Sequence, residues 1–205
     1  MTSSVSKSKS SSSKIGVVIL NGFLGSGKTT LFRNLLSQSK KKKISVCAIV
    51  NDMSELDVDG DLISNTEIVE ENNQILESIP SCVLSSKQGI KKLDKAIKKL
   101  LSNQSPVLII VETSGSCHPL PLVEYFKNHQ EVQLNGLFTL VDSLMLSHDY
   151  NYGETLIPKM QHNLAQGKRD TVNLLVEQIM FCSHLILTKA DRIGKEKLTD
   201  IATYV

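Results

Sequence analysis

Short runs of apolar residues recur along the chain and are separated by stretches with helical periodicity. The runs consist mainly of Val, Ile and Leu without alternating polar residues, and they occupy residues 15–20, 44–50, 107–111, 137–141 and 184–187. Unbroken aliphatic runs are typical of strands that are buried on both faces of a parallel sheet. The helical pattern occupies residues 29–39, 87–101, 120–128 and 171–182. Strands that alternate with helices predict an α/β fold, with a mostly parallel central sheet covered by helices on both faces.

Three segments fall outside this pattern. Residues 1–14 are mostly Ser and Lys, which cannot bury enough apolar surface to fold, so we expect a disordered tail followed by one domain over residues 15–205. Residues 40–43 are all lysine and predict a solvated loop between a helix and a strand. Residues 146–169 show little periodicity, and we interpret them as a long surface excursion.

Composition excludes several classes of protein. A length of 205 residues suits one domain, and a hydrophobic fraction of 40% is too high for a mostly disordered chain. No apolar run approaches the ~20 residues that a membrane-spanning helix needs, so we expect no membrane partner. The formal net charge of +2 argues against a protein dedicated to nucleic acid. The four cysteines are widely spaced and follow no secretory signal, which favours a reducing, cytoplasmic setting.

The sequence GFLGSGKTT follows the first predicted strand, at residues 22–30, and fits the phosphate-binding pattern G-x-x-x-x-G-K-[ST]. Its glycines allow backbone N–H groups to face phosphate oxygens, and the N-terminus of the next helix adds positive potential. Lys28 would contact the β- and γ-phosphates, and the hydroxyl of Thr29 would bind Mg²⁺. The residues that we expect to hold the nucleotide here are Gly22, Gly25, Ser26, Gly27, Lys28, Thr29 and Thr30.

Two acidic segments follow later strands. In the sequence ETSG at residues 112–115, Glu112 would reach the Mg²⁺ ion or orient water, and Gly115 would offer its N–H to the γ-phosphate. In the sequence NDMSE at residues 51–55, Asp52 would supply a further carboxylate near Mg²⁺, although Asn and Asp are equally typical of helix N-caps. We therefore predict catalytic roles for Lys28, Asp52, Glu112 and Gly115, with Mg²⁺ held by Thr29, Asp52 and Glu112.

The sequence TKAD at residues 188–191 differs in one residue from the guanine-binding pattern N-K-x-D. The Asp191 carboxylate would accept hydrogen bonds from N1–H and the 2-amino group of guanine, a donor pair that adenine lacks. The stem of Lys189 would pack along the base. Thr188 replaces the amide of Asn, and we expect the loss of a contact that steadies the loop. This segment predicts GTP as the nucleotide.

Together these residues resemble the CobW-type metallochaperone GTPases, relatives of the nickel-insertion GTPases of urease and hydrogenase. The resemblance runs from residue 15 to about residue 193 and rests on residues 22–31, 51–55, 112–115, 141–142, 177–179 and 187–191. The form NDMSE and the long insertion are most similar to a zinc-linked subgroup. The resemblance implies a three-layer P-loop NTPase whose slow GTP hydrolysis is coupled to zinc or cobalt transfer. It also implies GTP, GDP, a metalloprotein client and a second copy of the chain as partners.

The metal motif departs from that family. The family carries Cys-x-Cys-Cys, whereas residues 82–85 read CVLS, so that only Cys82 remains. Cys82 would need Cys117 and His118, with Glu55 or Asp52, to complete a zinc site. The alternative is that both thiols are ordinary and that His118 only precedes a helix. The family's GTPase domain is also followed by a smaller C-terminal domain, which we expect to be absent because the chain ends at residue 205.

Three functions are consistent with the sequence. The first is a Mg²⁺-dependent GTPase with slow turnover, because none of the arginines lies in a motif that places it at the phosphates. The second is a GTP-dependent binding or regulatory module that has lost metal delivery and hydrolysis. The third is a P-loop kinase that phosphorylates a small molecule, which the sequence TKAD disfavours.

Overall fold

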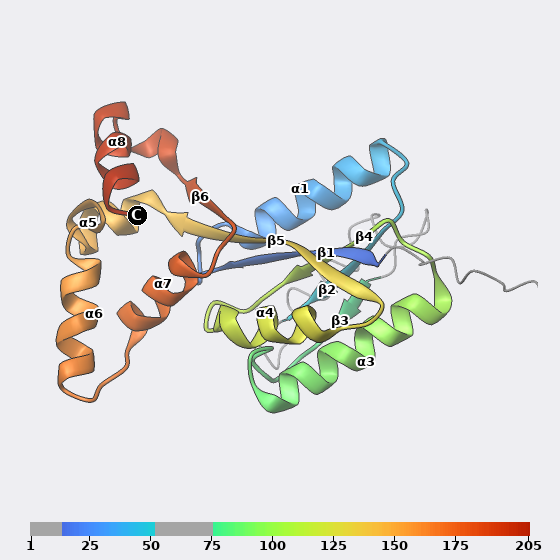
Figure 1. Cartoon of the computed structure of the whole chain (residues 1–205). Coiled ribbons are helices and arrows are strands. Elements are labelled where there is room, and N and C mark those ends of the chain that lie inside the picture. The colour runs from blue at the N-terminus through green and yellow to red at the C-terminus, as the bar shows by residue number, and fades with distance from the viewer. Residues whose placement is uncertain (1–13, 52–75) are drawn as a thin grey trace, which may run out of the picture.

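The central sheet of the computed structural model, which describes residues 14–51 and 76–205, has six parallel strands (Figure 1). Their order across the sheet is β3-β2-β4-β1-β5-β6. The strands are β1 (Ile15–Gly22), β2 (Val46–Val50), β3 (Leu76–Ser78), β4 (Leu108–Glu112), β5 (Val132–Asp142) and β6 (His184–Thr188). The predicted α/β fold with a parallel sheet is confirmed, and all five predicted strands are present. The additional strand, β3, is only three residues long.

Side chains of the central strands alternate between two apolar layers, which explains their unbroken aliphatic sequences. On β1, Val17 and Ile19 enter one layer and Leu20 enters the other. On the neighbouring strand β4, Ile109 and Val111 lie in the first layer while Ile110 lies in the second. A strand with apolar neighbours on both faces is aliphatic at every position.

Helices cover both faces of the sheet. Figure 1 shows α1 on one face and α3 with α4 on the other, and the buried clusters agree with this arrangement. Phe32 of α1 packs in one layer, whereas Leu93 of α3 and Leu122 of α4 pack in the other. The helices are α1 (Lys28–Lys41), α3 (Lys87–Asn103), α4 (Pro119–Asn128), α5 (Ser143–Asp149), α6 (Leu156–Ala165), α7 (Thr171–Met180) and α8 (Lys195–Tyr204). None of these described helices is long and apolar enough to cross a membrane.

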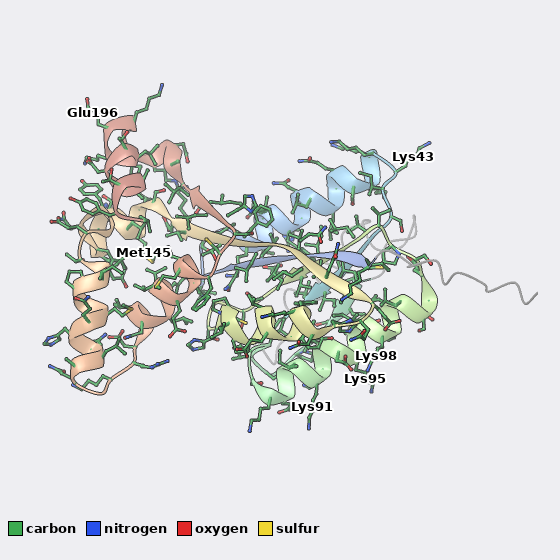
Figure 2. The ribbon with its side chains drawn as sticks, in the orientation of Figure 1. Lys43, Lys91, Lys95, Lys98, Met145 and Glu196 are labelled. Carbon is green, nitrogen blue, oxygen red and sulfur yellow. The ribbon has the colours of Figure 1, made fainter. Side chains whose placement is uncertain are left out.

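The helix boundaries follow local signals. The Ser86 side chain caps α3 by accepting a hydrogen bond from the backbone N–H of Gly89. The side chain of Asp170 caps α7 and forms a capping box with Asn173. Lys91, Lys95 and Lys98 lie on the outer side of α3, directed away from the sheet (Figure 2).

The segment 146–169 lies largely at the surface, as expected, but it is mostly helical rather than irregular. It contains most of α5, a 3₁₀ turn at Asn151–Gly153 and all of α6. Leu146 and Leu156 are buried in an apolar cluster with α7 and α8. The two helices are only 7 and 10 residues long, and Tyr152 between them has a φ of 60°. The helix is interrupted at Tyr152, so a window of about 11–18 residues spans two short helices and does not detect the helical period of either one.

We predict that Leu146→Ala and Leu156→Ala each lower the free energy of unfolding by about 2–5 kcal/mol, because each leaves a cavity in a packed cluster. Urea denaturation followed by circular dichroism measures the change. Leu164→Ala is the matched control: its side chain is exposed, so the effect should stay within about 0.5 kcal/mol. Equal effects at all three positions would contradict the helical packing of this segment.

Candidate nucleotide-binding site

The glycine-rich loop connects the end of β1 to the start of α1. Gly22 has a φ of 132°, and a Cβ atom there would lie 2.2 Å from the carbonyl oxygen of Leu140 on β5. Only glycine therefore fits where the chain turns out of the sheet. The last glycine of the loop, Gly27, has a left-handed conformation and is the N-cap of α1. The N-terminus of the helix therefore begins directly at the loop.

Lys28 lies inside this loop. Its ammonium donates hydrogen bonds of 2.8 Å to the carbonyl oxygens of Gly22 and Phe23. Burial lowers the pKa of Lys28 below its ordinary value, and the nearby carboxylate of Glu112 offsets part of that effect. Phosphate oxygens are acceptors of the same kind as the two carbonyls, so the position of Lys28 suits an anionic ligand.

Glu112 contacts Thr29 at the centre of the site. The Thr29 hydroxyl donates to the Glu112 carboxylate over 2.5 Å, although 83 residues separate the two in sequence. Glu112 ends β4, where it pairs in register with Leu20 of β1, and it is 5% exposed. A hydroxyl and a carboxylate are the oxygen donors that Mg²⁺ prefers, so this pair fits the predicted ion.

A cavity of about 440 Å³ opens on one side of the loop. Lys28, Thr29 and Glu112 line it, together with residues 113–116, which we call the switch loop. The switch loop lies against the glycine-rich loop, since a Cβ atom on Gly115 would come within 2.6 Å of the backbone nitrogen of Leu24. The structure thus brings the predicted residues Lys28, Thr29, Glu112 and Gly115 together.

A second cavity, of about 380 Å³, opens on the other side of the loop. It is lined by Ser26, Gly27 and Thr30 from the glycine-rich loop and helix α1. Thr188, Lys189 and Asp191 line it from the opposite side, at the end of β6 and in the 3₁₀ turn Ala190–Arg192. The two predicted motifs therefore face each other across one cavity.

The loop after β6 is held by two contacts with the end of β5. The Thr188 hydroxyl donates to the carbonyl oxygen of Val141 over 3.2 Å. The Lys189 ammonium donates to the Asp142 carboxylate over 2.5 Å. The Thr188 hydroxyl therefore bonds to the neighbouring strand, and the expected loss of the contact that Asn would make stays a prediction.

Asn51 has a structural role that the sequence did not reveal. Its side-chain oxygen accepts from the backbone N–H groups of Ser114, at 3.4 Å, and Leu84, at 3.3 Å. Its amide nitrogen donates to the carbonyl oxygens of Ile79 and Cys82, at 2.9 and 2.7 Å. Asn51 is 4% exposed and joins the switch loop to the segment that carries Cys82. The predicted residues Asp52 and Glu55 lie outside the described residues.

The candidate zinc ligands that the structure describes do not form a site by themselves. Within residues 14–51 and 76–205, no three His, Cys, Asp or Glu side chains gather as a metal would require. Burial raises the pKa of the Cys117 thiol to about 11, and Cys82 is also buried. His118 is exposed, and its Nδ1 lies 2.7 Å from the Glu177 carboxylate.

The model of the CobW/HypB/UreG nucleotide-binding domain matches residues 16–205. The chain belongs to this family. The matched range includes the glycine-rich loop, the switch loop and the segment 188–191. The family resemblance that the sequence suggested is thereby confirmed.

Two relatives of this CobW/HypB/UreG domain illustrate the similarity. The chain is 32% identical over 203 residues to the zinc-regulated GTPase metalloprotein activator 1 of Dictyostelium discoideum, covering 92% of the chain and 42% of that relative. It is 30% identical over 194 residues to the zinc chaperone YjiA of Escherichia coli K12, covering 90% of the chain and 52% of YjiA. The chain thus spans about half the length, or less, of these curated relatives.

Solved structures agree on the fold. The Zn(II)-bound YjiA GTPase of E. coli superposes with a TM-score of 0.58 at 23% identity, over 92% of this chain and 54% of that one. The signal recognition particle receptor FtsY of Elizabethkingia anophelis, solved with GDP, gives a TM-score of 0.56 at 12% identity, over 97% of this chain and 56% of FtsY. At these identities the likeness concerns the fold alone.

The Asp142–Lys189 ion pair makes stability depend on pH. Burial raises the pKa of Asp142, but the Lys189 ammonium and backbone N–H groups of α5 outweigh it, so the pKa lies below its ordinary value. A carboxyl group with a depressed pKa stabilises the fold above its unfolded-state pKa of about 3.9, and this contribution is lost as the pH falls through the folded-state pKa.

We predict that Asp142→Asn lowers the free energy of unfolding near neutral pH by up to about 1 kcal/mol, because the ion pair is partly exposed and Asn retains the helix cap. The difference should begin to shrink as the pH falls below about 4 and should vanish once the pH lies below the folded-state pKa, where the protonated wild-type side chain resembles Asn. Urea denaturation from pH 3 to 7 measures it, with the exposed Asp149→Asn as control. A difference that does not shrink between pH 7 and pH 3 would contradict this origin.

Proposed function

We propose that the chain binds GTP and hydrolyses it to GDP and phosphate with Mg²⁺. The observation that supports this most is the pair of cavities on either side of one glycine-rich loop. One cavity has the charged groups that a triphosphate needs, and the other is lined by Lys189 and Asp191, which suit guanine. An exposed carboxylate such as that of Asp191 can accept both hydrogen bonds from the guanine edge.

The glycine-rich loop would bind the phosphates. Lys28 would exchange its two carbonyl acceptors for β- and γ-phosphate oxygens. The Ser26 hydroxyl is buried and has no hydrogen-bond partner in the described part of the chain, so a phosphate oxygen would satisfy it. Thr29 and Glu112 would hold Mg²⁺, which supplies positive charge next to the phosphates when it is bound.

Hydrolysis would need little covalent chemistry from the protein. Water attacks the γ-phosphorus, the bond to the β-phosphate oxygen breaks, and GDP leaves with inorganic phosphate as the second product. Lys28 would stabilise charge on the oxygen atoms, and Gly115 would offer its backbone N–H to the γ-phosphate. Arg169 donates to Glu177 on α7 and would not act as an arginine finger in this position, so turnover would be slow.

The relatives support a link to metal transfer, since they are named as a zinc-regulated GTPase metalloprotein activator and a zinc chaperone. We propose that nucleotide hydrolysis is coupled to the delivery of zinc or cobalt to a metalloprotein client. One observation favours a second candidate, a GTP-dependent regulatory module without metal delivery. The sequence retains only one thiol at residues 82–85, and Cys82 lies buried with its carbonyl bonded to Asn51.

A single-turnover assay separates the two candidates. With excess protein, GTP and Mg²⁺, we expect phosphate release slower than about one per second. Glu112→Gln should slow that release by about 10²-fold, because it removes a charge beside the reacting phosphate. Glu196→Gln, on the exposed outer side of α8, is the matched control and should leave the rate unchanged (Figure 2). Tight GTP binding without release would instead favour the regulatory module.

Nucleotide specificity provides the test of the second cavity. We expect Asp191→Asn to weaken GTP binding by about 10²-fold, because charged hydrogen bonds to guanine are lost. Xanthosine triphosphate should regain affinity, since its 2-keto oxygen accepts from the Asn amide. Asp200→Asn, an exposed residue of α8, is the control, and calorimetry measures all affinities. A wild-type preference for ATP over GTP would contradict the assignment and would favour a kinase.

A further inference from the structure

Helix α7 reaches the switch loop through a buried amide, that of Gln178. Its Nε2 group donates to the carbonyl oxygens of Gly115, at 3.2 Å, and Cys117, at 3.0 Å. The same nitrogen lies 3.4 Å from the side-chain oxygen of Asn21, at the end of β1. Gln178 has no exposed surface. One side chain of α7 therefore contacts both the switch loop and the strand that leads into the glycine-rich loop.

The neighbouring residue of α7 adds a second, exposed contact. A carboxylate oxygen of Glu177 accepts from Nδ1 of His118 over 2.7 Å, and Arg169 donates to its other oxygen over 3.3 Å. Two consecutive residues of α7 thus contact the segment that follows Glu112 at the end of β4. Figure 1 shows α7 beside the end of β1, in agreement with these contacts.

The geometry of Gln178 is not that of a side chain optimised for stability alone. Its Oε1 atom and Nδ2 of Asn21 are both buried without a hydrogen-bond partner among the described residues. A buried polar atom without a partner destabilises the fold, so the hydrogen bonds to the two carbonyls come with a cost in stability. A flipped Gln178 amide would place its oxygen against two carbonyl oxygens, so the orientation of the donor is fixed by the loop.

We infer that Gln178 is a positioning residue, which holds the switch loop in the geometry that receives the γ-phosphate. This inference rests on the proposed GTP binding. Gly115 lies against the glycine-rich loop, and its carbonyl oxygen is one of the two that accept hydrogen bonds from Gln178. A loop that is already ordered loses less conformational entropy when its N–H groups bind a ligand. GDP has no γ-phosphate, so its affinity should not depend on the hydrogen bonds between Gln178 and the switch loop.

The affinity ratio between a non-hydrolysable GTP analogue and GDP tests the inference on the full chain with Mg²⁺. Gln178→Glu keeps the shape but turns an oxygen toward the two carbonyls, and Gln178→Met removes the donor without adding charge. For both variants we expect the analogue to bind about tenfold more weakly, the loss of roughly one hydrogen bond, while GDP affinity changes less than about twofold. The Met variant keeps the test valid if the Glu variant does not fold.

A matched control separates positioning from stability. The Thr139 hydroxyl donates to the backbone carbonyl of Gln178 over 2.8 Å, without contacting the switch loop. Thr139→Val should therefore lower the melting temperature and leave the affinity ratio unchanged. An unchanged affinity ratio in the Gln178 variants, with or without equal losses for both nucleotides, would overturn the inference and leave Gln178 with a structural role only. A wild-type chain that binds neither nucleotide would overturn the proposed function itself, and the inference with it.

Discussion

The parallel pairing of β1 with β4 fixes the centre of the site. Because Leu20 lies in register with Glu112, the strand that carries the acidic residue ends beside the strand that leads into the glycine-rich loop. The first turn of α1 then brings the Thr29 hydroxyl to the Glu112 carboxylate. A carboxylate with so little exposure is costly unless it is hydrogen-bonded or near a positive charge, and Lys28 supplies that charge. Shifting this register by one residue would turn Glu112 to the other face of the sheet and separate all three groups.

The same arrangement explains why amide side chains surround the site. Loops at the carboxyl edge of the sheet are partly buried here, so their backbone N–H and carbonyl groups need partners that regular structure does not supply. Asn21, Asn51 and Gln178 provide them, each from a different element and each nearly or fully buried. An amide carries both a donor and an acceptor, so it can bond two segments at once without introducing a buried charge. The switch loop is therefore held from three sides by neutral groups.

The sequence was sufficient to predict the features that depend on local pattern. The aliphatic strands, the glycine-rich loop and the segment 188–191 each have a short-range signature, and the family match at residues 16–205 agrees with them. It was not sufficient for contacts between distant residues. Gln178 and Asn21 are 157 residues apart, and Asn51 and Ser114 are 63 residues apart, so no periodicity relates them. Such partners become visible only when the sheet order is known.

The core also limits what Cys117 can do in this conformation. Its thiol belongs to the apolar layer under α3 and α4, and its raised pKa keeps it protonated at neutral pH. A zinc ligand must be a thiolate, so binding a metal at this position would require both deprotonation and exposure of the sulfur. Gln178 also donates to the backbone carbonyl oxygen of Cys117, so the residue whose thiol a metal would need is one that α7 already contacts.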